Sequence, residues 1–157
     1  MIITLHRRNK GISASWVGKL IRESRVGHLA TCDMSLKPHV VPICYVFHDG
    51  AIYSAVDEKP KRRRPASLRR IANIKANPNV CVVIDHYEED WRKLKFIIVQ
   101  GKAKLIFSGK EHHQAINRLR RKYPQYRFMN LQVRPIIKIK PRKNIAWRSD
   151  RLDSESK

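Results

Sequence analysis

The chain has 157 residues, a mass of 18.4 kDa and a sequence pI near 10.6. A chain of this length is typical of one domain with its own core, and a hydrophobic content of 42% excludes wholesale disorder. Its 34 Lys and Arg against 13 Asp and Glu leave a net charge of +21, which excludes an acidic solvating chain and favours an anionic partner.

Cysteine usage, the N-terminus and the length of the apolar runs exclude further classes of protein. Three cysteines without a Cys-x-x-Cys pair argue against a disulfide scaffold or a structural zinc site. The N-terminus has the wrong order of apolar and basic residues for a secretory signal, and no apolar run approaches the ~18 residues of a membrane span. We expect a soluble, cytoplasmic protein with no membrane partner. Residues 1–148 should form one domain, and residues 149–157 a polar, disordered tail.

Three segments carry apolar residues at the spacing of an amphipathic helix, and they cover residues 13–24, 68–77 and 110–123. Ser13 or Ser15 could cap the first of these helices and Ser67 the second. Asn77, followed by a proline, ends the second helix.

The remaining segments are rich in Val, Ile and aromatic residues, as strands are. The expected strands cover 26–33, 38–47, 51–56, 80–85, 94–107 and 133–140, with turns at 33–37 and 48–50. The strand at 94–107 is either one bent strand or two pieces broken at Gly101. Pro38 and Pro42 restrict the first half of the strand at 38–47 to a sheet edge or a bulge.

About six strands joined mostly by short turns favour a largely antiparallel sheet, and closing that sheet into a barrel removes its exposed edges. The sequence lacks the spaced βαβ units of a dinucleotide-binding fold. It therefore predicts a mainly β, α+β fold, a six-stranded antiparallel Greek-key-like barrel with three short flanking helices.

Common catalytic motifs are absent from the sequence. There is no Gly-x-Ser-x-Gly, no Walker loop and no His-Glu-x-x-His. Neighbouring His112 and His113 point to different sides of their helix and cannot easily share a metal ion, so both are interpreted as surface or half-buried histidines. Cys32, Cys44 and Cys81 lie in strand patterns, which is typical of small buried apolar residues. We name no catalytic residue and no metal ligand.

Four of the thirteen acidic residues cluster before a tryptophan: Asp85, Glu88, Glu89 and Asp90, then Trp91. The favoured interpretation is a solvated turn that pairs with some of the surplus arginines, and the alternative is a site for a cation or a substrate amine. Trp91 either anchors the loop, shields a planar ligand or packs under a neighbouring chain.

The strongest local signal is the basic segment from Lys59 to Arg70, in which seven of twelve residues are Lys or Arg and none is acidic. The segment leads into a helix N-terminus, where free backbone N–H groups attract anions, and Lys and Arg add charge-assisted hydrogen bonds. Phosphate or polyanion binding therefore stands beside the simpler interpretation of a solvated basic face.

The C-terminal part of the chain is free of acidic residues. No Asp or Glu occurs from His112 to Ser149, whereas eleven Lys or Arg lie between Arg118 and Arg148. Such a positive field would attract nucleic acid or another polyanion. Aromatic residues make up only 8% of the chain, and no RNA-binding aromatic motif or helix-turn-helix spacing is present, so charge alone favours no specific recognition.

The order of these motifs resembles the pyridoxamine 5'-phosphate oxidase-like split-barrel family, and within it the F-420-dependent oxidoreductases. The resemblance spans about residues 15–147 and is carried by VGHLATCDMSLKPHVVPICYVFHDGAIYSAVDEKPKR, LRRIANIKANPNVCVVIDHY, HYEEDW and KYPQYR. It implies a six-stranded FMN-binding split barrel that forms a homodimer, with a flavin or deazaflavin in a groove between the subunits.

The resemblance also implies the cofactor-binding residues. The strand PHVVPI would lay its backbone along the ring system through His39, Val40, Val41, Pro42 and Ile43. Pro42 removes one N–H where no ladder partner is wanted. Bordering residues would be Ser54, Ala55 and Val56, and the cofactor phosphate would be held by Lys59, Lys61 and Arg62. Further basic residues could meet the acidic oligoglutamate tail of F-420.

The function implied is hydride transfer between a cofactor and a small-molecule substrate, with coenzyme F-420 as the cofactor and FMN as the alternative. A non-catalytic flavin or deazaflavin carrier and a nucleic-acid-binding barrel are the competing hypotheses. The sequence departs from the family pattern at Leu36, where the turn usually carries Gly. Arg63 and Arg64 exceed what one cofactor phosphate needs.

Overall fold

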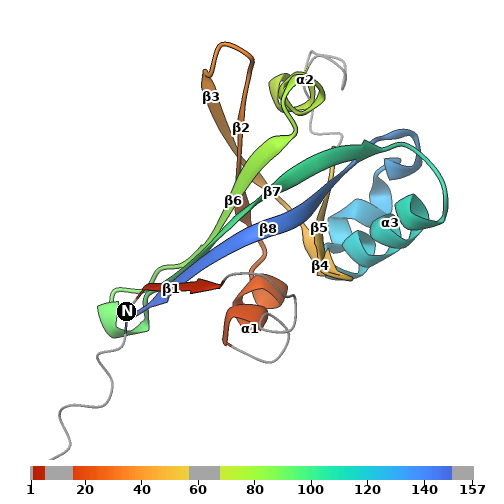
Figure 1. The fold of residues 1–157 in the computed structure, drawn as a ribbon. Helices are drawn as coiled ribbons and strands as arrows, with labels where there is room; N and C mark the ends of the chain where they lie inside the picture. The colour runs from red at the N-terminus through yellow and green to blue at the C-terminus, as the bar shows by residue number, and fades with distance from the viewer. Residues whose placement is uncertain (1, 6–15, 57–67, 150–157) are drawn as a thin grey trace, which may run out of the picture.

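A computed structural model describes residues 2–5, 16–56 and 68–149, with only the backbone described for 2–5. The strands are β1 (Ile2–Leu5), β2 (Gly27–Cys32), β3 (Pro38–Ile43), β4 (Val46–His48), β5 (Ala51–Ala55), β6 (Asn79–His86), β7 (Lys95–Ile106) and β8 (Ile136–Arg148). The helices are α1 (Trp16–Glu23), α2 (Arg69–Ala76) and α3 (Lys110–Lys122), with short 3-10 helices η3 (Trp91–Lys93), η4 (Pro124–Phe128) and η5 (Leu131–Val133). Figure 1 shows one strongly twisted sheet with the helices around it.

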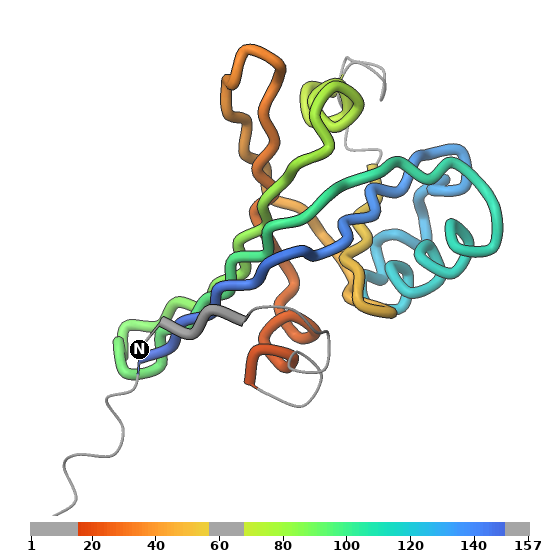
Figure 2. Tube along the Cα trace, viewed as in Figure 1, coloured from red at the N-terminus to blue at the C-terminus, as the bar shows by residue number. Residues whose placement is uncertain are grey.

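The sheet curls so that the two ends of its strand order are consecutive in the chain. The order is β3-β2-β6-β7-β8-β5-β4, with β1 added beside β8, and every pairing is antiparallel. Only Cys44 and Tyr45 separate β3 from β4, so one bent segment runs from one end of this order to the other (Figure 2). This confirms the expected antiparallel split barrel.

The strand count differs from the expected six for two reasons. The single strand expected at 38–47 divides at Cys44 and Tyr45, where the chain leaves β2 and joins β5. In addition, no strand was expected at residues 2–5, which pair with Asn144–Trp147 in β8. The predicted edge position of β3 is confirmed, since β3 pairs with β2 alone on this path.

A bulge at Gly101 explains the lengths of β7 and β8. β7 is one bent strand, the first of the two alternatives, and its register with β8 shifts between Gln100 and Gly101. A Cβ atom at Gly101 would lie 2.4 Å from the carbonyl oxygen of Lys140, so only glycine fits there. Pro141 lies opposite Gly101, and a bulge tolerates the missing N–H of a proline. β8 therefore continues to Arg148, and the expectation that it would span 133–140 was wrong.

The helices cover different parts of the sheet. Apolar residues of α1 and α2 join the core inside the curl, through Val17, Leu20, Ile21, Ile71 and Ile74. α3 instead packs on the other side of β5, which is why Ile52 belongs to one core cluster and its neighbour Tyr53 to the other. All three expected helices are confirmed. The expected caps Ser13, Ser15 and Ser67 lie outside the described residues.

The turn between β2 and β3 carries the departure at Leu36. Leu36 has φ 59°, a left-handed conformation that glycine adopts at lower cost. Its neighbour Asp33 holds the turn together, because its Oδ1 accepts hydrogen bonds from the backbone N–H groups of Ser35 at 2.9 Å and Lys37 at 3.0 Å. The hydrogen bond from Lys37 also lowers the pKa of Asp33.

Burial corrects two details of the sequence analysis. Cys32, Cys44 and Cys81 are half-buried rather than buried, because each points away from the interior of the curl. His112, interpreted as a surface or half-buried histidine, is 1% exposed, and its Nε2 lies 2.8 Å from the carbonyl oxygen of Arg134. In the described part of the chain, every helix is too short or too polar to cross a bilayer.

Candidate functional site

A groove of about 470 Å³ runs across the sheet between β2, β3, β6, β7 and β8. It is lined by Ala30, Thr31, Cys32, Pro38, Asn79, Val80, Cys81, Gln100, Gly101, Arg142 and Lys143. Most of these residues are small or apolar, and the two cations lie together on β8 at one end. The groove therefore combines a largely apolar floor with a cationic end.

Strand register explains how residues far apart in the sequence reach this groove. Val40, Ala30, Cys81, Gln100 and Lys143 are cross-strand neighbours on five successive strands. They form one row, because side chains at paired positions point to the same face of a sheet. This face is opposite to the packed interior, and Val40 on the edge strand is 58% exposed.

A second row on the same face is apolar and only partly buried. Pro42 on β3 is paired with His28, and the row continues through Val83, Ile98 and Ile145. Beyond it, the rings of Phe96 and Trp147 stack with their centres 5.6 Å apart. Their cross-strand neighbour Asp85 is exposed and lies 3.7 Å from the Nδ1 atom of His28. The outer face of the sheet is therefore a broad, partly apolar surface beside the groove.

α2 lies against β2, the neighbour of the edge strand β3. The side-chain amide of Asn73 donates a hydrogen bond to the Thr31 hydroxyl at 3.0 Å, and both residues are buried. Burial and the nearby guanidinium groups of Arg69 and Arg70 lower the pKa of His39. Cations at the beginning of α2 therefore act on the strand that the sequence analysis assigned to the cofactor ring.

The structure brings some of the expected cofactor-binding residues together. Val40 and Pro42 are exposed on the outer face, whereas His39 and Val41 are half-buried and Ile43 is buried. The Ser54 hydroxyl donates a hydrogen bond at 2.8 Å to the carbonyl oxygen of Cys44, the residue after β3. β5 and the end of β3 are therefore adjacent.

Other expected cofactor-binding residues are buried within the protomer or lie outside the described residues. Ser54, Ala55 and Val56 are all buried within the protomer, at 1%, 5% and 0% exposure. Lys59, Lys61 and Arg62, together with Arg63 and Arg64, lie outside the described residues. The structure thus places the β3 and β5 parts of the expected site next to each other.

Arg142 and Lys143 were not expected as site residues from the sequence. The acid-free stretch from His112 to Ser149 marked this region as positive, but it could not show which cations face the groove. The bulge at Gly101 shifts the register at this point, so that Lys143 rather than Arg142 is paired with Gln100. A simple alternation along β8 gives no hint of this shift.

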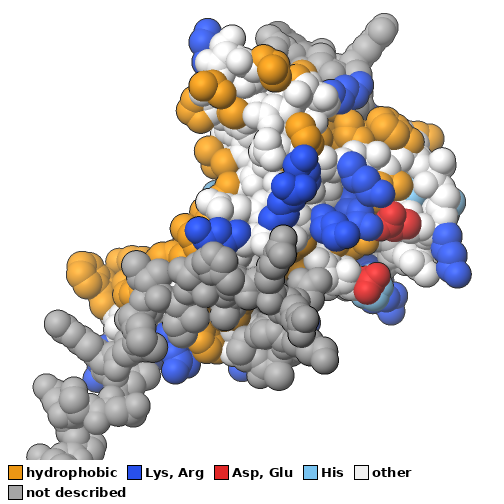
Figure 3. Space-filling view, viewed as in Figure 1, with side chains coloured by type: hydrophobic (Ala, Val, Ile, Leu, Met, Phe, Trp, Pro, Cys, Tyr) orange, Lys and Arg blue, Asp and Glu red, His pale blue; other side chains and the backbone are white. Residues whose placement is uncertain are grey.

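A lysine ladder adjoins the groove along β7 and β8. Lys102 is paired with Lys140, and Lys104 with Lys138. Like charges directly opposite each other are destabilising, and Glu111 offsets one pair by binding Lys138 and lying 3.9 Å from Lys104. These contacts and the Tyr53 hydroxyl lower the pKa of Glu111, with the hydrogen bond from Lys138 the largest cause. Figure 3 shows Lys and Arg side chains gathered over the middle of these strands.

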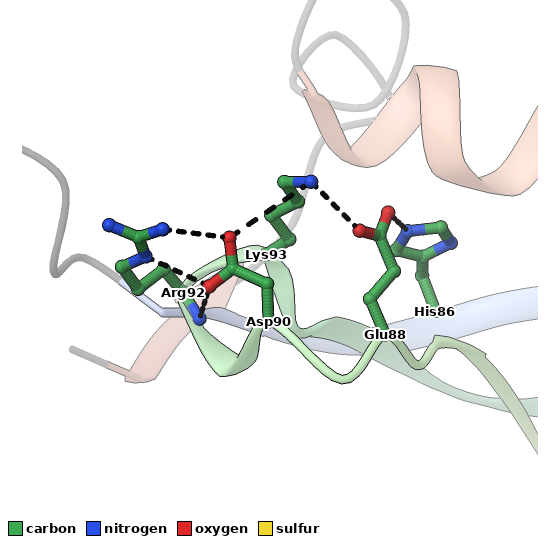
Figure 4. A network of polar contacts seen from close by, with 5 residues as sticks. All are labelled: His86, Glu88, Asp90, Arg92 and Lys93. Carbon is green, nitrogen blue, oxygen red and sulfur yellow. Dashed lines mark hydrogen bonds and ion pairs between the residues drawn. The ribbon is translucent and has the colours of Figure 1, made fainter.

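In the acidic turn, residues 85–93, Glu88 and Asp90 pair with residues a few positions away (Figure 4). Glu88 lies 2.7 Å from the Nε2 atom of His86 and 3.1 Å from Lys93, and these contacts lower its pKa. Arg92 donates to both carboxylate oxygens of Asp90, at 2.8 and 3.1 Å. This confirms the favoured interpretation of a solvated, ion-paired turn.

Two features of this part of the chain bear on ligand binding. Trp91 is 69% exposed, so its side chain is accessible to a planar ligand or to a neighbouring chain. Among the described side chains, no group of three or more His, Cys, Asp or Glu converges where it could hold a metal ion.

Comparison with known proteins places these features in a family context. The family model described as pyridoxamine 5'-phosphate oxidase matches residues 17–148. No curated protein matches the sequence. A heme storage protein of Vibrio cholerae, HutZ, is 16% identical with a TM-score of 0.65, and the match covers 82% of this chain and 89% of that one.

Two further solved structures share the fold. A FAD-binding protein of Mesorhizobium loti is 20% identical with a TM-score of 0.61, and the match covers 93% of this chain and 96% of that one. A protein named F420 reductase is 17% identical with a TM-score of 0.58, and the match covers 80% of this chain and 93% of that one. At these identities the likeness shows the fold.

Proposed function

The chain belongs to the pyridoxamine 5'-phosphate oxidase family, and from this premise we propose that it is an oxidoreductase that uses a flavin-type cofactor. The proposed cofactor is the deazaflavin coenzyme F-420, with FMN as the alternative, and the substrate is a small molecule. The observation that carries the proposal is the groove across β2, β6, β7 and β8, with its apolar floor and its cationic end at Arg142 and Lys143.

The residues of the groove fit such a cofactor. Its volume of about 470 Å³ lies within the range of about 300–1,000 Å³ that is usual for ligand sites. A row of small side chains across a sheet offers a flat floor to a planar ring. Guanidinium and ammonium groups at one end suit an anionic group, because Arg can grip two oxygens at once.

Each part of the site has a proposed task. The exposed edge of β3, from His39 to Ile43, would present backbone groups to the ring, and Pro42 supports this because it leaves one N–H out of the ladder. Ser54, Ala55 and Val56 would border the site from β5. The hydrogen bond from Ser54 to the Cys44 carbonyl holds the end of β3 beside them. Lys59, Lys61 and Arg62 would hold the phosphate.

In this proposal the bound cofactor supplies the hydride chemistry. The chain binds and orients it, and a covered groove keeps water out, which strengthens the hold of the cations on an anionic group. No side chain is assigned a proton transfer, in keeping with the absence of a catalytic motif in the sequence.

A second copy of the chain is the proposed cover of the outer face. The row formed by Val83, Ile98 and Ile145 is only partly buried in the protomer, and the Phe96–Trp147 stack extends it. Partly apolar surface of this kind next to a groove is typical of an association site. A homodimer would bury this surface and close the groove with one wall from each subunit.

Absorbance titration of the purified protein with F-420 and with FMN tests the cofactor. We expect saturable binding of one of them, weakened about tenfold or more in the double variant Arg142→Gln/Lys143→Gln, since a charged hydrogen bond contributes about 1.5–3 kcal/mol. Lys59→Ala/Lys61→Ala should weaken it by a similar amount. Arg127→Gln, on η4 outside the groove, is the matched control. Equal affinities for all four proteins would remove the proposed site.

The alternatives have their own readouts. A non-catalytic carrier would bind cofactor but show no turnover when the reduced cofactor is supplied with candidate substrates, and the fold likeness to a heme storage protein makes this outcome worth measuring. A nucleic-acid-binding barrel would show a steep salt dependence of binding to single or double strands.

A further inference from the structure

A second pocket of about 410 Å³ lies between α1, β4 and α3. It is lined by Arg22, Val46, Phe47, Arg118, Arg121 and Lys122, and it shares none of these residues with the groove. Four of the six lining side chains are cationic and none is acidic. We call it the basic pocket.

Helix geometry directs the cations toward one space. Arg118, Arg121 and Lys122 are spaced three and four residues apart in the last turns of α3, so they lie on one face of that helix. Arg22 comes from the last turn of α1. Two helices therefore present cations to the same cavity, while Val46 and Phe47 of β4 supply an apolar wall.

Capping of helix ends explains only part of this arrangement. Lys122 donates a hydrogen bond at 2.6 Å to the carbonyl oxygen of Ser24, which follows α1, and so satisfies a carbonyl group there. Arg118 and Arg121 make no hydrogen bond or ion pair with any residue that the structure describes, although Arg118 is half-buried. Their charges thus face the pocket without a local partner in the described chain.

Lys122 brings a half-buried positive charge to the basic pocket. Its ammonium group lies 4.5 Å from the centre of the Tyr45 ring. Burial, helped by repulsion from Arg25, lowers the pKa of Lys122 to about 8. A half-buried ammonium among arginines is costly, and an anion in the pocket would remove that cost.

We propose that the basic pocket binds the phosphoryl group of a small phosphorylated molecule, at a site separate from the cofactor groove. A diphosphate carries enough negative charge to meet several cations, and the guanidinium forks of Arg118 and Arg121 match its oxygen atoms. The site is a local pocket whose volume of about 410 Å³ is in the range of small-molecule sites, whereas a nucleic-acid strand would follow an extended basic groove.

Calorimetric titration with pyrophosphate tests the site on the full chain. We expect the wild type to bind, and Arg118→Gln/Arg121→Gln to bind at least tenfold more weakly. Arg127→Gln, which removes an exposed charge from the same acid-free stretch outside the pocket, should bind within about twofold of wild type. The single variant Arg121→Gln, at an exposed position, should show an intermediate loss even if the double variant fails to fold.

A single-stranded oligonucleotide is the second probe. The proposal is overturned if the wild type does not bind pyrophosphate, or if Arg121→Gln binds it as tightly as Arg127→Gln does. It is equally overturned if oligonucleotide binding alone depends on Arg118 and Arg121. F-420 and FMN titrations of the same variants should match wild type, so failure here and failure of the cofactor proposal are distinguishable.

Discussion

The acidic turn and the basic pocket treat charge in opposite ways. In the acidic turn, Glu88 and Asp90 meet cations from residues a few positions away, and all of these groups remain in contact with water. In the basic pocket, cations from α1 and α3 converge without an acidic residue in the lining. A net charge of +21 therefore says little about stability until burial is known. Exposed ion pairs change the free energy of unfolding little, whereas charges that are partly buried change it more.

Tyrosines and carbonyl groups hold the cations near the basic pocket. The Tyr123 hydroxyl lies 2.8 Å from the carbonyl oxygens of both Arg25 and Tyr45, and it accepts a hydrogen bond from the Tyr45 N–H at 3.0 Å. The Arg25 guanidinium lies 4.9 Å from the centre of the Tyr123 ring. Cation–π contacts and hydrogen bonds to carbonyl groups thus take the place that carboxylates have in the acidic turn.

The largest expected effect comes from Tyr123→Phe. The change leaves the buried N–H and carbonyl groups of Tyr45, and the partly buried carbonyl group of Arg25, without their shared partner, so the free energy of unfolding should fall by about 2–3 kcal/mol. Urea unfolding measures it. Tyr87→Phe is the control, because Tyr87 is 62% exposed, and it should leave the unfolding midpoint unchanged. Equal small effects of both changes would show that the buried network is not what holds α3 to β4.

Periodicity predicted much of this fold because it depends on short segments. The apolar stripes of α1, α2 and α3 and the prolines that mark β3 as an edge are local signals, and the structure bears them out. The bulge at Gly101 is different, since its cause is the approach of the Lys140 carbonyl from another strand. Local patterns cannot report such a contact.

The candidate sites were predictable to a smaller extent, for the same reason. The acid-free stretch marked the region of Arg118, Arg121 and Lys143 as positive. Which of these cations face a cavity depends on where α3 meets α1 and on the register of β8, and both are set by tertiary packing. The resemblance to a family pointed to β3 and β5, whose adjacency the Ser54–Cys44 hydrogen bond then made visible.

An intermediate effect is expected from pH. Between about pH 8 and 10.5 the unfolded chain keeps a proton on Lys122 that the folded chain has lost, so raising the pH there should stabilise the fold. Above about pH 10 the sign reverses, because burial raises the pKa of Tyr45 and that of Tyr123, the latter to about 12, and the unfolded tyrosines ionise first.

Urea midpoints at pH 7, 9.5 and 11 should therefore rise and then fall. The variant Lys122→Met lacks the titrating ammonium group and should lose the rise while keeping the fall. A midpoint of the wild type that decreases steadily from pH 7 would contradict the burial of Lys122 beside Arg25.

The smallest expected effect is that of Asp90→Ala in the acidic turn. Asp90 binds Arg92 through two oxygens and accepts a hydrogen bond from the Arg92 N–H at 3.2 Å, but the turn is exposed and η3 is only three residues long. Water replaces these contacts when the carboxylate is removed, so the urea unfolding midpoint should not move measurably in 0.1 M salt. A shift as large as that of Tyr123→Phe would mean that the ion pairs of this turn anchor the β6–β7 hairpin, and the contrast between exposed and buried charge would then fail where it is simplest to measure.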